Sequence, residues 1–125
     1  VSGSSALVHS GFVTYSNQSK VEQLGLDPDL INQHGAVSKI VVENMVTGLI
    51  DKTTADCAIA TSGIAGPSGG TIDKPVGTVW ISVGDKAKGM MAKEFLFTGD
   101  REEVRFQSVL ESFRLLEFFL TRSEL

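Results

Sequence analysis

Three short β-prone segments lie between helical segments, and this arrangement most limits the folds open to the chain. Residues 57–61 are continuously apolar, as in a buried strand, and residues 76–83 are rich in valine. Residues 90–97 form a third segment, and the six-residue link over 84–89 makes the last two an antiparallel hairpin. Strands of this kind combined with helices predict an α/β domain.

The N-terminal half is predicted to add one strand and three helices. Residues 10–16 form the strand. The helices are expected over residues 20–24, over residues 28–33 after the N-cap Asp27, and from the N-cap Ser38 to about Asp51. The helical crossover makes the strand 10–16 parallel to 57–61. If 76–83 runs antiparallel to 57–61, its hairpin partner 90–97 is parallel to both 10–16 and 57–61. The expected sheet is therefore mixed and mostly parallel.

In this topology three segments leave the sheet at one edge. They are residues 16–20, 62–75 and 98–101. This is the carboxyl edge of the parallel strands, where open α/β sheets place their ligands. Unpatterned stretches as long as 62–76 are uncommon in compact domains and are often functional. The sequence therefore predicts a site at this edge.

The first of these segments carries Tyr15 and Lys20, a hydroxyl and an amine separated by a strand end and a turn. A partly buried lysine can lose its proton and act as a base. The alternative is a tyrosine at a strand end beside a solvated lysine, with no chemical role for either.

The other two segments carry groups suited to an anion. The glycine-rich stretch from Thr61 to Thr71 lets backbone N–H groups approach an anion closely, or it is a flexible surface loop. It matches neither the Walker A pattern nor the Rossmann fingerprint. Arg101 and Arg105 lie one turn apart on one face of a helix, where they suit a phosphate. An ion pair with Glu102 is the alternative.

The last helix is predicted to begin after the N-cap Asp100, with Glu103 completing a capping box, and to run to near Leu125. One apolar stripe comprises Phe106, Val109, Leu110, Phe113, Leu116 and Leu120, and a second group comprises Val104, Leu115, Phe118 and Phe119. Since one sheet face covers one stripe, the helix is either deeply buried or packs on a second subunit. We expect a homo-oligomer, most simply a two-fold dimer, with the side of 104, 115, 118 and 119 near the contact.

Composition and charge argue against several classes of protein. The 125 residues fit one domain, and 15 acidic against 11 basic residues give a net charge of −4. That balance argues against nucleic acid as a partner, and no apolar run reaches the roughly 20 residues that span a membrane. One Cys and two His without ligand spacing argue against a disulfide and a metal site. Without a secretion-signal pattern at its start, the chain is expected to be soluble and cytoplasmic.

Several longer motifs follow one another along nearly the whole chain. They are Gly3-Ser4-Ser5, Val13-Thr14-Tyr15-Ser16-Asn17 with Lys20, Leu24-Gly25, His34-Gly35-Ala36-Val37-Ser38, Gly63-Ile64-Ala65-Gly66-Pro67-Ser68-Gly69-Gly70-Thr71, Lys74-Pro75-Val76-Gly77-Thr78-Val79, and Gly99-Asp100-Arg101 with Arg105. In this order the chain resembles the CinA C-terminal domain family, the nicotinamide-nucleotide amidases. The glycine-rich run continuing into Lys74-Pro75 is the most specific part of the resemblance.

The resemblance implies a three-layer α/β/α sandwich with a mixed sheet. It also implies hydrolysis of the carboxamide of nicotinamide mononucleotide, a small-molecule nucleotide, to nicotinate mononucleotide and ammonia. The family is thought to use a serine nucleophile, with Lys20 here matching the base and Tyr15 the assisting group, and neither metal nor cofactor. The residues that would line the substrate pocket or bind its phosphate are Ser62, Gly63, Ala65, Gly66, Arg101 and Arg105.

One departure from the family pattern concerns the nucleophile. The family carries it in a Ser-Cys-Thr-Gly-Gly stretch that opens the first helix, upstream of the residues matched here. The chain is therefore expected to be a single CinA C-terminal-like domain over residues 1–125 without that helix and segment. Two functions stay open: an amidase, or a catalytically silent nucleotide-binding or assembly domain of a competence/damage-inducible CinA-type protein.

Overall fold

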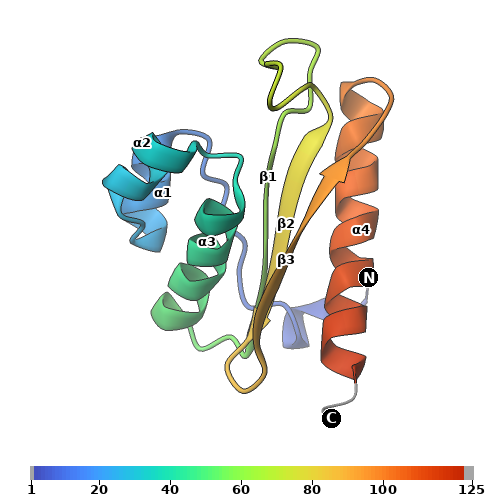
Figure 1. The fold of residues 1–125 in the computed structure, drawn as a ribbon. Helices are drawn as coiled ribbons and strands as arrows, with labels where there is room; N and C mark the ends of the chain where they lie inside the picture. Colours follow the sequence, from blue (N-terminus) through green and yellow to red (C-terminus); the bar gives the residue numbers. More distant parts are fainter. Residues whose placement is uncertain (1, 123–125) are drawn as a thin grey trace.

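The computed structural model describes residues 2–122, which form helices on both sides of one sheet (Figure 1). In chain order the elements are a 3-10 helix η1 (Ser4–Ala6), α1 (Asn17–Leu24), α2 (Pro28–His34), α3 (Lys39–Lys52), β1 (Cys57–Gly63), β2 (Thr78–Asp85), β3 (Gly89–Leu96) and α4 (Arg101–Thr121). The predicted continuation of the last helix to near Leu125 falls on 123–125, outside the described residues. None of the helices between residues 2 and 122 has the length and apolar character to cross a membrane.

The sheet has three strands in the order β1-β2-β3, and both pairs are antiparallel. Ile59 pairs with Val83, and Ile81 pairs with Lys93. The predicted strands after residue 56 and their hairpin are therefore confirmed. The prediction of a mixed, mostly parallel sheet is wrong for the described residues, because its parallel character depended on a first strand that does not pair.

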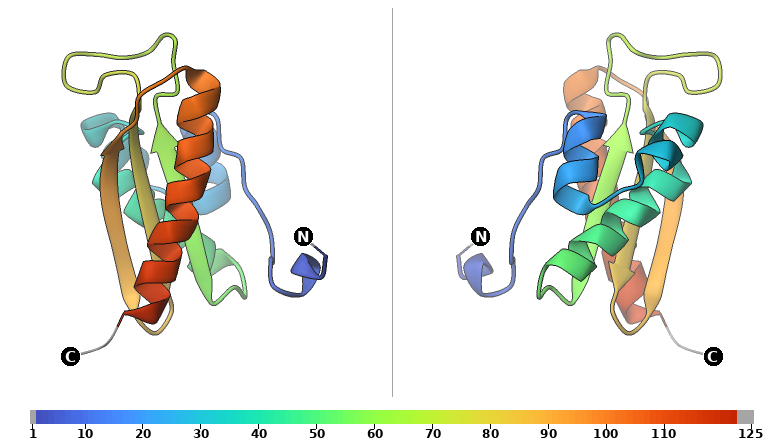
Figure 2. Two further views of the ribbon diagram at one scale, coloured as in Figure 1. Left: turned by 90° about the vertical axis from the view of Figure 1, so that its right-hand side faces the viewer. Right: turned by 90° about the vertical axis from the view of Figure 1, so that its left-hand side faces the viewer.

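That missing strand is the segment over 10–16, which runs beside the domain outside the sheet (Figure 2). Val13 is 72% exposed and Tyr15 is 90% exposed. A β-prone segment forms a strand where its side chains can pack on a pleated, half-buried surface. Among the described residues nothing covers the outer side of this segment, so its composition alone does not make it pair. Its last residue, Ser16, serves instead as the N-cap of α1.

The helices cover the two faces of the sheet with two separate apolar clusters. On one face α3 packs on small side chains of the strands, such as Ala58 and Ala60, and α1 and α2 pack on α3. On the other face α4 packs on Ile81 and its neighbours in β2. Successive strand residues alternate between these faces, as the period of two requires.

Two of the helix starts follow their sequence signals. Asp27 accepts a hydrogen bond from the backbone N–H of Asp29, with Pro28 at the first helical position. Asp100 and Glu103 form the predicted capping box of α4, each side chain accepting from the other residue's backbone N–H. These local signals also define where the segments between the helices begin and end.

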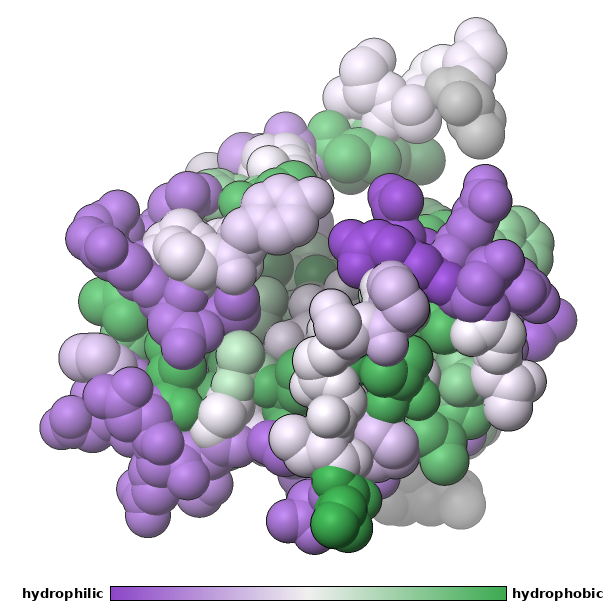
Figure 3. Space-filling view, turned by 90° about the horizontal axis from the view of Figure 1, so that it is seen from above, coloured by the Kyte–Doolittle hydropathy of each residue, from purple (hydrophilic) through white to green (hydrophobic). Residues whose placement is uncertain are grey.

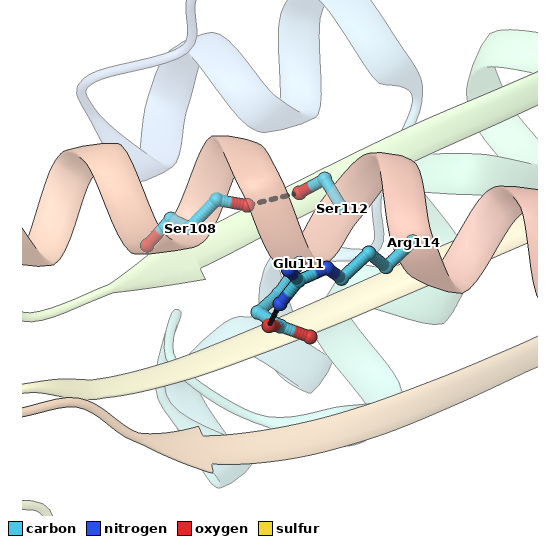
Figure 4. Close-up of polar contacts among 4 residues, drawn as sticks. All are labelled: Ser108, Glu111, Ser112 and Arg114. Carbon is cyan, nitrogen blue, oxygen red and sulfur yellow. Dashed lines mark hydrogen bonds and ion pairs between the residues drawn. The ribbon is translucent and has the colours of Figure 1, made fainter.

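The face of α4 that meets the sheet is not the one predicted. The buried line is Val104, Ser108, Ser112, Leu115 and Phe119, although Ser108 is only half-buried. Ser108 donates to the carbonyl of Val104 at 2.7 Å. Ser112 donates to the carbonyl of Ser108 at 2.6 Å, as Figure 4 shows. Because both hydroxyls are satisfied inside the helix, they can face the sheet at little cost.

The apolar stripe predicted as the main core stripe is consequently exposed in part. Phe106 is 68% exposed and Phe113 is 62% exposed. Of the residues predicted to lie near a subunit contact, Val104, Leu115 and Phe119 are buried against the sheet, and only Phe118 is exposed. The subunit contact itself stays a prediction. Most of the exposed apolar surface of α4 therefore lies on the stripe that contains Phe106 and Phe113.

Candidate active site

The three segments predicted to share one edge do meet at one end of the molecule. There β1 ends at Gly63 and the loop over 64–77 begins, while α4 starts beside it (Figure 1). Ile64 donates to the carbonyl of Thr78, and Phe97 donates to that of Gly77, so backbone hydrogen bonds join the loop to the segment that leads from β3 to α4. Residues 12–15 share a cavity with β1, which brings the first segment to the same place.

Lys20 is the one lysine buried at this end, with 5% of its surface exposed. It lies on α1, which Ser16 caps by accepting from the backbone N–H of Ser19 at 3.0 Å. The lysine Nζ donates a 2.7 Å hydrogen bond to the carbonyl oxygen of Thr14. Burial lowers the pKa of Lys20 from its ordinary value of 10.5, because the charged ammonium loses water around it. The neutral amine, which can accept a proton, is thereby favoured.

Packing of α1 on α3 holds Lys20 in this position. Gly48 of α3 lies so close to the end of α1 that a Cβ there would be 2.0 Å from the carbonyl oxygen of Leu24. Only glycine permits this approach. The short α1 is therefore held against the longer α3, and the backbone position of Lys20 on α1 is fixed.

A cavity of about 560 Å³ joins Lys20 to Tyr15 and to the end of β1. Its polar lining includes Thr14, Tyr15, Lys20, Thr61 and Ser62, and Phe12 and Ile59 are among its apolar lining residues. Seen from above, the surface is hollowed between polar groups on both sides (Figure 3). The cavity is thus lined by residues that carry an amine, a phenol and aliphatic hydroxyls, which are groups that can move protons.

The end of β1 depends on one glycine for its approach to β2. A Cβ at Gly63 would lie 2.6 Å from Cγ2 of Val79 and 3.0 Å from the carbonyl oxygen of Thr78. A larger residue would push the start of the loop away from the sheet. Gly63 also lines the cavity with Lys20, so this close packing shapes the site.

The remaining predicted residues lie elsewhere around the loop. Ala65 and Arg105 line a second, more apolar cavity of about 400 Å³ between β1 and α4, which Gly63 also touches. Arg101 lines neither cavity, and its Nη1 donates a 3.1 Å hydrogen bond to the carbonyl oxygen of Gly66. The structure therefore brings Tyr15, Lys20, Ser62 and Gly63 together at one cavity and places the two arginines on α4, outside that cavity.

Two features of the site had no signal in the sequence. The carbonyl of Thr14 is a backbone acceptor for Lys20, and backbone acceptors are not visible in residue types. Lys74 donates from its Nζ to the carbonyl of His34 at 2.9 Å, which ties the loop to α2 across 40 residues of sequence. Within residues 2–122 there is no group of three or more His, Cys, Asp and Glu side chains placed to hold a metal ion.

The chain has relatives that share both its sequence and its fold. The CinA C-terminal domain family matches over residues 1–120. A protein named nicotinamide-nucleotide amidohydrolase PncC from Pseudomonas putida is 50% identical over 110 residues, which are 88% of this chain and 68% of that protein. A CinA-like protein from Shewanella pealeana is 47% identical over 116 residues, which are 93% of this chain and 27% of that longer protein.

A solved structure gives the same result for the fold. The competence/damage inducible protein CihA from Agrobacterium tumefaciens superposes with a TM-score of 0.94 at 34% identity, covering 97% of this chain and 74% of that one. The family match extends over nearly the whole chain, so it includes the segments that form the cavity and the loop. By sequence and by fold, the chain belongs to the CinA C-terminal domain family.

Proposed function

We propose that this domain is part of an enzyme that hydrolyses the carboxamide of nicotinamide mononucleotide to nicotinate mononucleotide and ammonia. The observation that carries the proposal is the buried amine of Lys20, which opens on a cavity with Tyr15 and has a pKa lowered by burial. Relatives named nicotinamide-nucleotide amidohydrolase, at up to 50% identity, supply the substrate class.

The chemistry requires Lys20 in its neutral form, toward which burial shifts the equilibrium. A neutral amine accepts the proton of a serine hydroxyl while the serine oxygen attacks the carboxamide carbon. The resulting ammonium returns the proton to the leaving nitrogen, which departs as ammonia. Water then hydrolyses the acyl-serine to the carboxylate, and Tyr15 assists the proton transfers from the same cavity.

The nucleophile in this proposal comes from the family resemblance. The Ser-Cys-Thr-Gly-Gly stretch precedes the matched motifs in the family, so the activity is proposed for the protein that carries it. Ser62 lines the cavity with Lys20 and is the alternative nucleophile within this chain. Amidase activity of residues 1–125 alone that disappears in Ser62→Ala would assign the role to Ser62.

The substrate is expected to lie along the start of the loop. Gly63 and Ser62 line the cavity at the reacting end, with Ala65 and Gly66 continuing the loop from it. Arg101 and Arg105 remain the candidate phosphate ligands, since both lie on the first turns of α4. A small-molecule nucleotide is thus the proposed partner, and a metal-free reaction is part of the proposal.

The three-layer α/β/α sandwich and the single-domain organisation over residues 1–125 are proposed alongside this function. Helices on both faces of the sheet support the layered arrangement (Figure 1). A stable, monophasic unfolding transition of residues 1–125 is the result expected for one cooperative domain.

The direct experiment measures product formation from nicotinamide mononucleotide by the full-length protein. Ammonia and nicotinate mononucleotide should appear in equal amounts, because each hydrolysis releases one of each. Products other than these, or none, would reject the proposal.

A second candidate function is a catalytically silent nucleotide-binding or assembly domain. The observation that favours it is the match to a much longer CinA-like protein, of which this chain covers 27%. For residues 1–125 alone we expect nucleotide binding in a calorimetric titration and negligible turnover. Binding without turnover in the full-length protein as well would select the silent domain over the amidase.

A further inference from the structure

The loop over 64–77 is tied to helices on opposite sides of the sheet. Arg101 at the start of α4 donates from Nη1 to the carbonyl oxygen of Gly66 at 3.1 Å. Lys74 in the loop donates from Nζ to the carbonyl oxygen of His34, the last residue of α2, at 2.9 Å. Figure 1 shows the loop above the end of the sheet, with α2 on one side and α4 on the other.

We call these two hydrogen bonds the Arg101 tether and the Lys74 tether. Near the Arg101 tether, the beginning and the end of the loop pack against each other. Gly66 is buried and has a φ of +85°, and a Cβ there would lie 2.6 Å from Cγ1 of Val76. A Cβ at Gly70 would lie 2.7 Å from the backbone nitrogen of the same valine. Because Gly66 and Gly70 pack against Val76, a contact with Gly66 restrains both the first and the last part of the loop. Arg101 therefore restrains more than the one residue it touches.

At the Lys74 tether the surroundings leave space for the amine. Gly35 follows His34 with a φ of +78°, and a Cβ on it would lie 3.0 Å from Nζ of Lys74. The backbone of Lys74 is held in a turn, since its N–H donates to Oγ1 of Thr71 and its carbonyl accepts from the N–H of Thr71. The lysine thus reaches α2 from a fixed position in the loop.

The tethers bear on the cavity because the loop starts at its wall. Ser62 and Gly63 line the cavity with Lys20, and Ile64 is the first loop residue after them. A displacement of the loop relative to α4 or α2 would move this wall relative to the amine. A misplacement of about 1 Å in such a wall is enough to slow a reaction markedly.

We propose that Arg101 and Lys74 are positioning residues that hold the glycine-rich loop over 64–77 in place at the cavity. Arg101 then acts through the carbonyl of Gly66, and its contribution does not require a phosphate on the substrate. For its effect on turnover this inference rests on the proposed amidase function, whereas its structural part does not.

The structural part is tested by amide hydrogen exchange in the full-length protein without substrate. In Arg101→Gln and in Lys74→Gln, the amides of 64–77 should exchange about tenfold faster than in the wild type, while those of the strands keep their rates. Arg114→Gln and Lys86→Gln are matched controls, because both residues are exposed and neither contacts the loop through its side chain. Unchanged exchange over 64–77 in both tether variants would overturn the proposal.

A kinetic comparison separates positioning from phosphate binding. The nucleotide and the corresponding nucleoside, which lacks the phosphate, are compared as substrates of Arg101→Gln. Positioning predicts that kcat/KM falls by a similar factor, about tenfold, for both substrates, with partial recovery in Arg101→Lys. A loss confined to the nucleotide would make Arg101 a phosphate ligand and contradict the positioning role. If the wild type has no amidase activity, the proposed function fails, and hydrogen exchange alone decides the role of the tethers.

Discussion

The Nζ of Lys20 and the carbonyl oxygen of Thr14 lie 2.7 Å apart, and this hydrogen bond orients the one buried lysine of the cavity. A neutral amine has two N–H groups and one lone pair. When one N–H donates to Thr14, the lone pair is left to accept a proton from a group in the cavity. The bond also holds the backbone immediately before Tyr15.

The lowered pKa of Lys20 predicts a pH-dependent cost to stability. The folded protein binds this proton less tightly than the unfolded chain, whose lysine has the ordinary pKa of 10.5. The cost is full below the folded-state pKa and disappears as the pH rises toward 10.5. The free energy of unfolding of the wild type should therefore rise relative to that of Lys20→Met between pH 7 and pH 10, as measured by urea unfolding. If the free energies of unfolding of the two proteins changed in parallel with pH, burial would not destabilise the charged form of Lys20.

The close approach of the loop to the segment between β3 and α4 predicts that Gly77 tolerates no side chain. Its φ is +96°, and a Cβ would lie 2.1 Å from the carbonyl oxygen of Phe97. Gly77→Ala should lower the free energy of unfolding by about 2–4 kcal/mol, through backbone strain and this clash. Gly89→Ala is the matched control, because Gly89 has a φ of +85° and open space around it. Gly89→Ala should lower the free energy of unfolding by only about 1 kcal/mol. Equal losses in the two variants would show that the close contact of Gly77 with Phe97 does not affect stability.

Self-association remains a prediction, and the structure indicates a different surface for it. Phe106 and Phe113 are exposed on one stripe of α4 together with Val109 and Leu110. Exposed apolar patches of this kind are typical of interaction surfaces. Sedimentation at micromolar concentration should show more than a monomer for the wild type and a monomer for Phe106→Glu/Phe113→Glu.

The control for this experiment lies on another side of the same helix. Phe118 is 58% exposed and is not part of that stripe. Phe118→Glu should therefore leave the association unchanged. A monomeric wild type, or equal association of the wild type and the double variant, would show that the stripe with Phe106 and Phe113 does not mediate self-association.

Removal of metal ions is expected to leave the activity intact, since the proposed reaction needs only the nucleophilic serine, Lys20 and Tyr15. Ammonia release by the full-length protein should be the same before and after treatment with EDTA. Loss of activity on chelation followed by recovery on adding a divalent metal would refute the metal-free mechanism.

The parts of the fold that depend on local chemistry could be predicted from the sequence. The capping box of Asp100 and Glu103, the Asp27-Pro28 helix start and the hairpin of β2 and β3 each depend on residues that are close in the chain. The strand over 10–16 could not be judged in this way. Whether it pairs depends on what covers it, which is a property of the assembled structure.

The face of α4 shows a second limit of hydropathy. Ser108 and Ser112 look like surface residues, but each hydroxyl donates to a carbonyl four residues earlier and faces the sheet. In the site, the resemblance to the family identified Lys20 and Tyr15, which the structure places at one cavity. The role of Arg101 toward Gly66 had no such signal, since its acceptor is a backbone oxygen. The cytoplasmic location also stays a prediction.

The central claim is that Lys20 supplies the base of an amide hydrolysis. The most direct measurement is ammonia release from nicotinamide mononucleotide by the full-length wild type, by Lys20→Ala and by the control Lys39→Ala, which alters an exposed lysine on α3. The account predicts that Lys20→Ala loses about 10²-fold or more in kcat while still binding the nucleotide, and that Lys39→Ala keeps the wild-type rate. Wild-type turnover in a folded Lys20→Ala variant would contradict it.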